Sequence, residues 1–205
     1  MTKLLCLGDS ITDCGRFFSC PPLGNGYVRM LSEKLSANHK NWNIVNCGID
    51  GFTISRLLEN IDRNYLPQKP DIISVLIGIN DIGLMMNTGR TALQQKEMMQ
   101  RFFQKYEMLL QLLCQSDRHI ILMEPFIFSC PEEFALWIPH VQAMSQGIED
   151  LARKFQLPYV HLQDRLNGLA QHQGLNFVTT DGIHLTAQGH KVIADALFEI
   201  LSEIS

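Results

Sequence analysis

Hydrophobic and polar positions alternate along this chain in two different rhythms. Short apolar runs of strand length are separated by longer segments in which apolar residues recur every three or four positions. This alternation is typical of a parallel β-sheet that helices cover on both faces. The expected strands are residues 3–7, 43–46, 71–77, 119–123 and 159–161.

Two of the predicted helices have a clear apolar stripe. The first covers about residues 91–115, and its stripe consists of Met99, Phe102, Phe103, Tyr106, Leu109, Leu110 and Leu113. The second is the last helix of the chain, which we expect to begin after Thr186 as its N-cap. Its stripe consists of Val192, Ile193, Ala196, Leu197, Ile200, Leu201 and Ile204. Stripes at this spacing pack against a core, so we assign neither of them to a cofactor.

Length and charge narrow the classes of function. The 205 residues suffice for one sizeable core and contain no internal repeat or linker, which predicts a single domain over residues 1–205. The formal net charge is -4 with both signs interspersed, so we expect no nucleic-acid partner and no polybasic membrane anchor. No apolar run approaches the length of a membrane span.

The cysteines and the first residues predict a cytoplasmic protein. The apolar run at residues 4–7 is too short for the core of a signal peptide. The six cysteines stand at irregular spacings without a CxxC pair, and we interpret them as reduced thiols.

Three small polar clusters follow predicted strands or precede the last helix, at residues 8–12, 78–81 and 181–184. Ligands gather beyond the carboxyl ends of strands in an open parallel sheet, so one shared site is expected there. Ser10 needs an adjacent base to become a nucleophile at neutral pH. His184 can be that base, and Asp181, three residues earlier, can orient its ring and stabilise the imidazolium.

An oxyanion would need further donors. Asn80 offers a side-chain amide, and the glycines of residues 46–51 offer backbone N–H groups, although spacing does not choose between Gly48 and Gly51. Asp9 and Asp81 are interpreted as structural carboxylates in tight turns. For Arg16, contact with substrate and a clamp on its loop through Asp13 both remain open.

With these residues the sequence resembles the SGNH, or GDSL, hydrolase family, whose four blocks are matched in order by residues 8–12, 48–53, 78–81 and 181–184. The resemblance implies a three-layer α/β/α sandwich with a flavodoxin-like sheet of five parallel strands. It also implies Ser10 as nucleophile and first oxyanion donor, Gly51 and Asn80 as the other donors, and Asp181 with His184 as the rest of the triad. No cofactor or metal is implied, and relatives of this kind often form homo-oligomers.

A finer resemblance, at residues 13–16, 23–28 and 123–126, is to the acetyl xylo-oligosaccharide esterase branch of the family. It implies hydrolysis of short-chain acyl esters, above all acetyl esters, on carbohydrates. Leu185 stands where many relatives have proline, and residues 82–86 lack the aromatic and basic residues expected of a xylan-specific relative. A lysophospholipase or thioesterase acting on longer acyl chains is therefore the nearest alternative.

Two alternatives belong to other classes of function. One is a metal-dependent phosphoesterase, whose hard-cation ligands would be Asp9, Asp13, Asp81, Asp181 and His184. The other is a sugar-binding module without catalysis.

We assign no catalytic or binding role to the remaining aromatic, histidine and cysteine residues. Aromatic residues predicted at the rim of the cleft are expected to be mostly core or wall, namely Phe17, Phe18, Phe126, Phe128 and Trp137. We assign no site to the other histidines, His190 among them. For Cys14 a chemical role would require an adjacent base, and the sequence offers no separate candidate.

Overall fold

The computed structural model describes residues 1–37 and 41–204. Its centre is a sheet of five parallel strands in the order β2-β1-β3-β4-β5, which confirms the predicted flavodoxin-like order. The strands are β1 (Thr2–Gly8), β2 (Trp42–Gly48), β3 (Ile72–Leu76), β4 (His119–Met123) and β5 (Tyr159–Val160).

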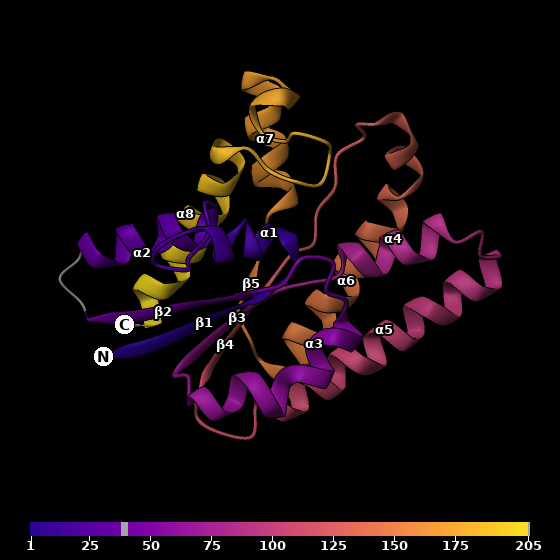
Figure 1. The fold of residues 1–205 in the computed structure, drawn as a ribbon. Coiled ribbons are helices and arrows are strands. Elements are labelled where there is room, and N and C mark those ends of the chain that lie inside the picture. Colours follow the sequence, from indigo (N-terminus) through magenta and orange to yellow (C-terminus); the bar gives the residue numbers. More distant parts are fainter. Residues whose placement is uncertain (38–40, 205) are drawn as a thin grey trace.

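Helices cover both faces of the sheet and complete the three layers (Figure 1). They are α1 (Ser10–Asp13), α2 (Tyr27–Ala37), α3 (Ile54–Asn60), α4 (Ile79–Asn87), α5 (Ala92–Leu113), α6 (Ile138–Phe155), α7 (Gln163–Gln173) and α8 (Ala187–Ile204). Helices α2 and α8 pack together on one face, and α3, α5 and α6 lie on the other. Within the described residues, no helix is long and apolar enough to cross a bilayer.

The two predicted apolar stripes form helices that pack on the core. Helix α5 starts at a capping box in which the Thr91 hydroxyl accepts from the Gln94 backbone N–H, while the Gln94 side chain accepts from the Thr91 N–H. At α8, the Thr186 hydroxyl accepts from the backbone N–H of Gly189 at 3.3 Å, as expected of an N-cap. The stripes therefore face the sheet, and the polar faces remain in water.

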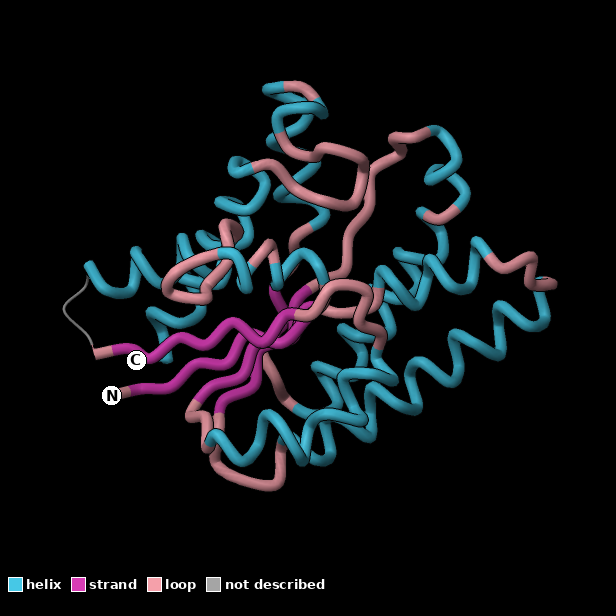
Figure 2. Tube along the Cα trace, in the orientation of Figure 1, coloured by secondary structure: helices cyan, strands magenta, loops and turns pink. Residues whose placement is uncertain are grey.

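The carboxyl ends of the central strands meet at one edge of the sheet. In register, Gly8 of β1 lies beside Gly48 of β2 and Leu76 of β3. Figure 2 shows that loops and the short α1 crowd above this edge. A Cβ atom at Gly8 would collide with the Thr12 hydroxyl and the Leu76 carbonyl, and one at Gly48 with the backbone N–H of Asp13. These two glycines let α1 sit directly on the strand ends.

Candidate active site

Ser10 is the first residue of α1 and follows β1 after a single connecting residue. That residue, Asp9, caps the helix, because its Oδ1 accepts from the backbone N–H of Ile11 at 3.1 Å. The helix ends after one turn at Cys14, whose left-handed backbone has a φ of 41°. Ser10 is thus held half-buried at the sheet edge on a short, capped turn.

The structure brings Ser10, His184 and Asp181 into one hydrogen-bonded chain. Ser10 Oγ lies 3.0 Å from His184 Nε2. On the other side of the ring, His184 Nδ1 lies 2.6 Å from Asp181 Oδ2. An ionised carboxylate only accepts, so Nδ1 carries the proton and Nε2 is free to accept from the Ser10 hydroxyl. This is the tautomer that a general base requires.

Asp181 is held in its ionised form by the loop around it. Its Oδ1 accepts backbone N–H bonds from Ile183 at 2.9 Å and from His184 at 2.7 Å. Partial burial acts to raise the pKa of Asp181, but the hydrogen bonds from the His184 side chain and from these two backbone groups outweigh it and lower the pKa below its usual value. The carboxylate therefore stays charged beside the imidazole.

The loop that carries His184 is fixed at its base. The Thr179 hydroxyl donates to the His184 carbonyl at 2.7 Å and accepts from the Gly182 backbone N–H at 2.9 Å. Gly182 has a φ of 91° and packs so closely on the Cys130 carbonyl that a side chain there would collide with it. The loop therefore holds the His184 imidazole in a fixed position, although the side chains of His184 and Asp181 are each 51% exposed.

The two other predicted oxyanion donors follow β2 and β3, the strands on either side of β1. Gly51 has a φ of 72° in the turn after β2, and Asn80 lies in the first turn of α4, after β3. One N–H of the Asn80 amide donates to the Phe52 carbonyl at 3.0 Å, which ties α4 to the turn that contains Gly51. The second amide N–H leaves Asn80 with a donor to offer a ligand.

Asp9 and Asp81 are buried acids that accept backbone hydrogen bonds. Asp9 bonds to its own helix, whereas Asp81 Oδ2 accepts from the backbone N–H of Ile54, 27 residues away, at 3.0 Å. Burial raises the pKa of each carboxyl to about 7. Asp81 therefore joins two strand-end loops, Asp9 caps its own helix, and both have structural contacts of the kind expected.

Arg16 clamps its loop through a backbone carbonyl. Its Nε donates to the Gly48 carbonyl at 2.6 Å, and its guanidinium lies 4.0 Å from the centre of the Phe17 ring. The Asp13 carboxylate instead accepts from the backbone N–H of Arg16 at 3.0 Å. The sequence left open whether Arg16 contacts substrate or clamps its loop through Asp13. The geometry favours the clamp, but the side chain bonds to the Gly48 carbonyl and not to Asp13.

The expectation that no base adjoins Cys14 was wrong. His190, six residues after His184 and on α8, places its Nε2 3.5 Å from Cys14 Sγ. Its Nδ1 accepts from the backbone N–H of Tyr27 at 3.3 Å. Sequence spacing cannot show this contact, because the pair are 176 residues apart. The only available signal was a histidine at a position that the helical period places toward the core.

The His190 contact nevertheless does not activate the thiol. Because Nδ1 accepts from Tyr27, the neutral ring carries its proton on Nε2 and donates it to the Cys14 sulfur. Burial, with a smaller contribution from His184, lowers the pKa of His190 to about 4. Burial also raises the pKa of the Cys14 thiol. The pair is therefore a packed contact between α1 and α8.

Of the aromatic residues expected near the cleft, only two are exposed. Phe126, Phe128 and Trp137 are buried, whereas Phe17 and Phe18 are 72% and 94% exposed. Across residues 1–37 and 41–204, no group of three or more His, Cys, Asp or Glu side chains is arranged to hold a metal ion.

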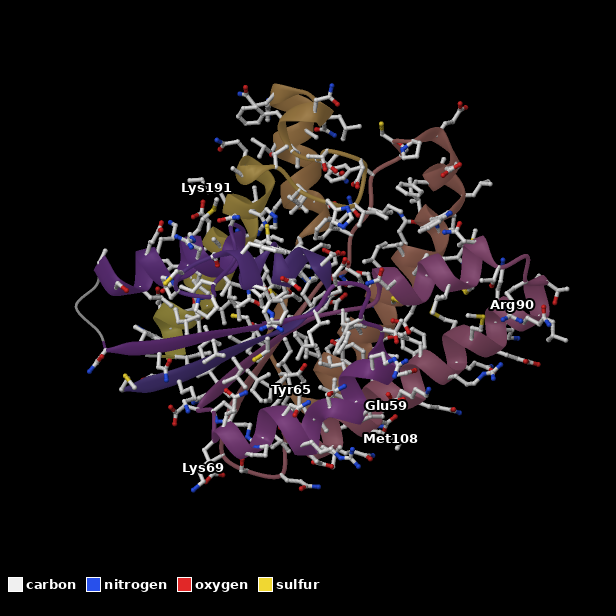
Figure 3. The ribbon with its side chains drawn as sticks, viewed as in Figure 1. Glu59, Tyr65, Lys69, Arg90, Met108 and Lys191 are labelled. Carbon is white, nitrogen blue, oxygen red and sulfur yellow. The ribbon has the colours of Figure 1, made fainter. Side chains whose placement is uncertain are left out.

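A shallow hollow of about 300 Å³ opens onto the Ser10 hydroxyl. It is lined by Ser10, Asp13, Cys14, Gly15, Phe17, Phe18, Asp50 and His184. A larger cavity of about 380 Å³ lies between α3, α4 and α5, and neither Ser10 nor His184 is among its described lining residues. Its wall includes Arg90, which Figure 3 labels at the far end of the α4–α5 hairpin. The hollow, not the larger cavity, adjoins the hydrogen-bonded chain.

Comparison with known proteins matches most of the chain to one family. The sequence profile of the GDSL-like Lipase/Acylhydrolase family matches residues 6–192. The chain is 30% identical over 208 residues to an acetylxylan esterase of Geobacillus stearothermophilus, covering 95% of this chain and 91% of that protein. The crystal structure of Axe2, an acetylxylan esterase from Geobacillus stearothermophilus, superposes with a TM-score of 0.82 at 27% identity, covering 97% of this chain and 93% of that chain.

A further solved structure matches in fold alone. LAE5, an alpha/beta hydrolase enzyme from the metagenome of Lake Arreo in Spain, superposes with a TM-score of 0.84 at 24% identity, covering 97% of this chain and 94% of that chain. With the profile match over most of its length, the chain belongs to the GDSL-like lipase/acylhydrolase family and is a carboxylic ester hydrolase.

Proposed function

We propose that this protein hydrolyses short-chain acyl esters, above all acetyl esters of carbohydrates, with Ser10 as nucleophile, His184 as general base and Asp181 as the residue that orients His184. The observation that carries the proposal is the continuous chain from Ser10 Oγ to His184 Nε2 at 3.0 Å and from His184 Nδ1 to Asp181 at 2.6 Å. Such a chain converts a weakly nucleophilic hydroxyl into an acyl acceptor.

The reaction has two steps. Ser10 Oγ attacks the ester carbonyl carbon while its proton passes to His184 Nε2, and the carbonyl oxygen becomes an oxyanion. The bond to the alcohol oxygen then breaks, and His184 returns the proton to that oxygen, leaving an acyl group on Ser10. Water, deprotonated by His184, attacks this acyl group and releases the acid and free Ser10. Asp181 stabilises the imidazolium in both steps.

The oxyanion would be bound by the backbone N–H groups of Ser10 and Gly51 and by the Asn80 side chain. The Asn80–Phe52 bond of 3.0 Å supports this role, because it holds the amide in place before substrate arrives. Removal of one such donor typically lowers kcat by about a hundred- to a thousandfold.

The acetyl preference rests on the relatives. The acetylxylan esterase relative has by name an acetylated sugar polymer as its substrate.

The test compares 4-nitrophenyl acetate with 4-nitrophenyl octanoate for the wild type and Ser10→Ala, each with and without EDTA. We expect chelator-resistant hydrolysis that favours acetate and falls by about a millionfold in kcat in the variant. Substantial activity in folded Ser10→Ala protein would exclude the serine mechanism, and loss of activity with EDTA would favour the metal-dependent alternative. A preference for octanoate would exclude the short-chain assignment.

A further inference from the structure

We propose that Phe18, with Phe17 and Asp50, forms the second half of the substrate site and binds the alcohol part of the ester. This half of the site accepts a neutral sugar ring and disfavours an anionic alcohol. This proposal rests on the proposed function, because it assigns the leaving group of the same reaction. It concerns residues that are otherwise unexplained, namely two exposed aromatic side chains and an exposed acid beside the nucleophile.

The position of His184 decides which part of the ester occupies the hollow. His184 must give its proton to the alcohol oxygen as that oxygen leaves, so the alcohol has to lie against the imidazole. The hollow is bounded by Ser10 and His184, whereas Gly51 and Asn80 are not among its lining residues in the described chain. The hollow therefore lies on the His184 side of Ser10, from which the alcohol leaves.

Phe18 offers an open aromatic face within that hollow. It is 94% exposed, and Phe17 beside it is 72% exposed with the Arg16 guanidinium 4.0 Å from its ring centre. Large apolar side chains that are left in water next to a reactive group indicate a ligand site. A pyranose ring presents a flat face of C–H groups that packs on such a ring, and its hydroxyls remain free to form hydrogen bonds.

The segment that carries the two rings is braced, so the platform is present before substrate binds. Arg16 is bonded to the Gly48 carbonyl at 2.6 Å. After the rings, the Ser19 hydroxyl donates to the Arg16 and Pro21 carbonyls at 3.1 and 3.0 Å. The backbone N–H of Gly24 donates to the same hydroxyl at 2.9 Å. A pre-formed surface spares the entropy that ordering a loop would cost on binding.

The acids of the hollow select the charge of the alcohol. Asp50 is exposed, and among the described residues its carboxylate has no hydrogen-bond or ion-pair partner, while its backbone N–H donates to Asp13 at 3.3 Å. The free carboxylate can accept hydroxyl hydrogen bonds from a sugar. Asp13 adds a second negative charge, and the Arg16 guanidinium is bonded to the Gly48 carbonyl and packed on Phe17. A phosphate-bearing alcohol would be repelled.

The test measures kcat/KM for three acetyl esters with different alcohols: an acetylated methyl xylopyranoside, ethyl acetate and 1-acetylglycerol 3-phosphate. In Phe18→Ala we expect kcat/KM on the xyloside to fall about three- to tenfold, because one ring contact is lost, while ethyl acetate is unaffected. Phe18→Trp should restore the xyloside rate. Asp50→Asn should raise the rate on the phosphate ester several-fold relative to ethyl acetate, and most strongly at low salt.

Leu93→Ala is the matched control, since Leu93 is an exposed apolar residue on α5 and 66% exposed. Equal losses on all three esters in Phe18→Ala, or no loss on the xyloside, would overturn the assignment of Phe18. A change of oligomeric state without a change in ester selectivity would show instead that the rings form a subunit contact. Ser10-dependent hydrolysis of ethyl acetate in each of these cases would leave the proposed esterase function intact, so the two failures are distinguishable.

Discussion

His184, in the loop before the last helix, and His190, in the first turns of that helix, show that the same type of side chain can serve opposite purposes. His184 lies in an exposed loop between a serine hydroxyl and a carboxylate. His190 is buried between a thiol and a backbone N–H. In each pair the partner at Nδ1 fixes the tautomer. Asp181 accepts the Nδ1 proton and frees Nε2 to act as a base, whereas the Tyr27 N–H donates to Nδ1 and leaves the proton on Nε2.

The comparison shows that proximity of a histidine to a nucleophile does not define a catalytic pair. Ser10 and Cys14 lie on the same short segment, and each has an imidazole nitrogen within 3.5 Å. Only the Ser10 partner has a carboxylate behind it and enough exposure to accept and release a proton. The Cys14 partner is held neutral, and we expect it to contribute packing and position.

The largest effect expected within this comparison is that of Asp181→Asn. The asparagine amide can donate to Nδ1 and would place the proton on Nε2, which is the tautomer that His190 has. We expect kcat for 4-nitrophenyl acetate to fall by about ten-thousandfold with little change in KM. Asp164→Asn, at an exposed acid in the first turn of α7, is the control and should leave the rate unchanged. Activity within tenfold of the wild type in Asp181→Asn would remove the carboxylate from the mechanism.

Burial of His190 should make the free energy of unfolding depend on pH. The ring has a pKa of about 4 in the folded protein, because it is buried, against about 6.5 when unfolded. Between these values the unfolded chain binds a proton that the folded chain does not, so the stabilising contribution of neutral His190 is lost as pH falls from about 6.5 to about 4. His190→Gln cannot titrate there. We expect the stability advantage of the wild type over this variant to shrink by up to about 3 kcal/mol between pH 7 and pH 4.

Urea unfolding at a series of pH values measures this difference. Packing losses in His190→Gln are the same at each pH, and the buried Asp9 and Asp81 titrate in both proteins, so both contributions cancel. His172→Gln, at an exposed position on α7, is the control and should show no such trend. If the difference in free energy of unfolding between the wild type and His190→Gln does not change with pH, His190 is not a buried neutral ring. If kcat of the variant falls more than a hundredfold at pH 8, His190 has a larger part in catalysis than positioning.

The smallest effect is expected from Cys14→Ser. The sulfur only accepts a long hydrogen bond of 3.5 Å, and a serine hydroxyl can also accept. We expect kcat/KM to change less than about threefold and the free energy of unfolding by about 1 kcal/mol. Cys114→Ser, at an exposed cysteine after α5, is the control. Loss of most activity in Cys14→Ser would contradict the interpretation that the Cys14–His190 contact contributes only packing and position.

Much of the fold could be predicted from the sequence, because burial of both faces of a parallel sheet leaves short continuous apolar runs. The strand at His119–Met123 was predicted at its observed bounds, and the others within two residues at each end. The strand order came from the family resemblance, since periodicity carries no information on which strands pair. No bounds were predicted for α4, whose first turn contains residues 79–81 of the second polar cluster.

The candidate site was predictable to the extent that its residues follow strands. Ser10, Asn80 and the turn with Gly51 each come after a strand end, and topology brings strand ends together. The Cys14–His190 contact and the bond from Asp81 to the Ile54 backbone join residues far apart in sequence without any shared pattern. Such contacts depend on how α1 packs on α8 and α3 on α4, and packing geometry cannot be derived from spacing.

The most direct test of the serine mechanism is to find the residue that carries the covalent intermediate. The protein is inactivated with diisopropyl fluorophosphate, digested and analysed by mass spectrometry, with His184→Ala treated in parallel. We predict one adduct on Ser10 in the wild type and strongly slowed labelling in His184→Ala, because the hydroxyl then lacks its base. Inactivation with the adduct on another residue, or full activity with Ser10 modified, would contradict the assignment of Ser10 as the nucleophile.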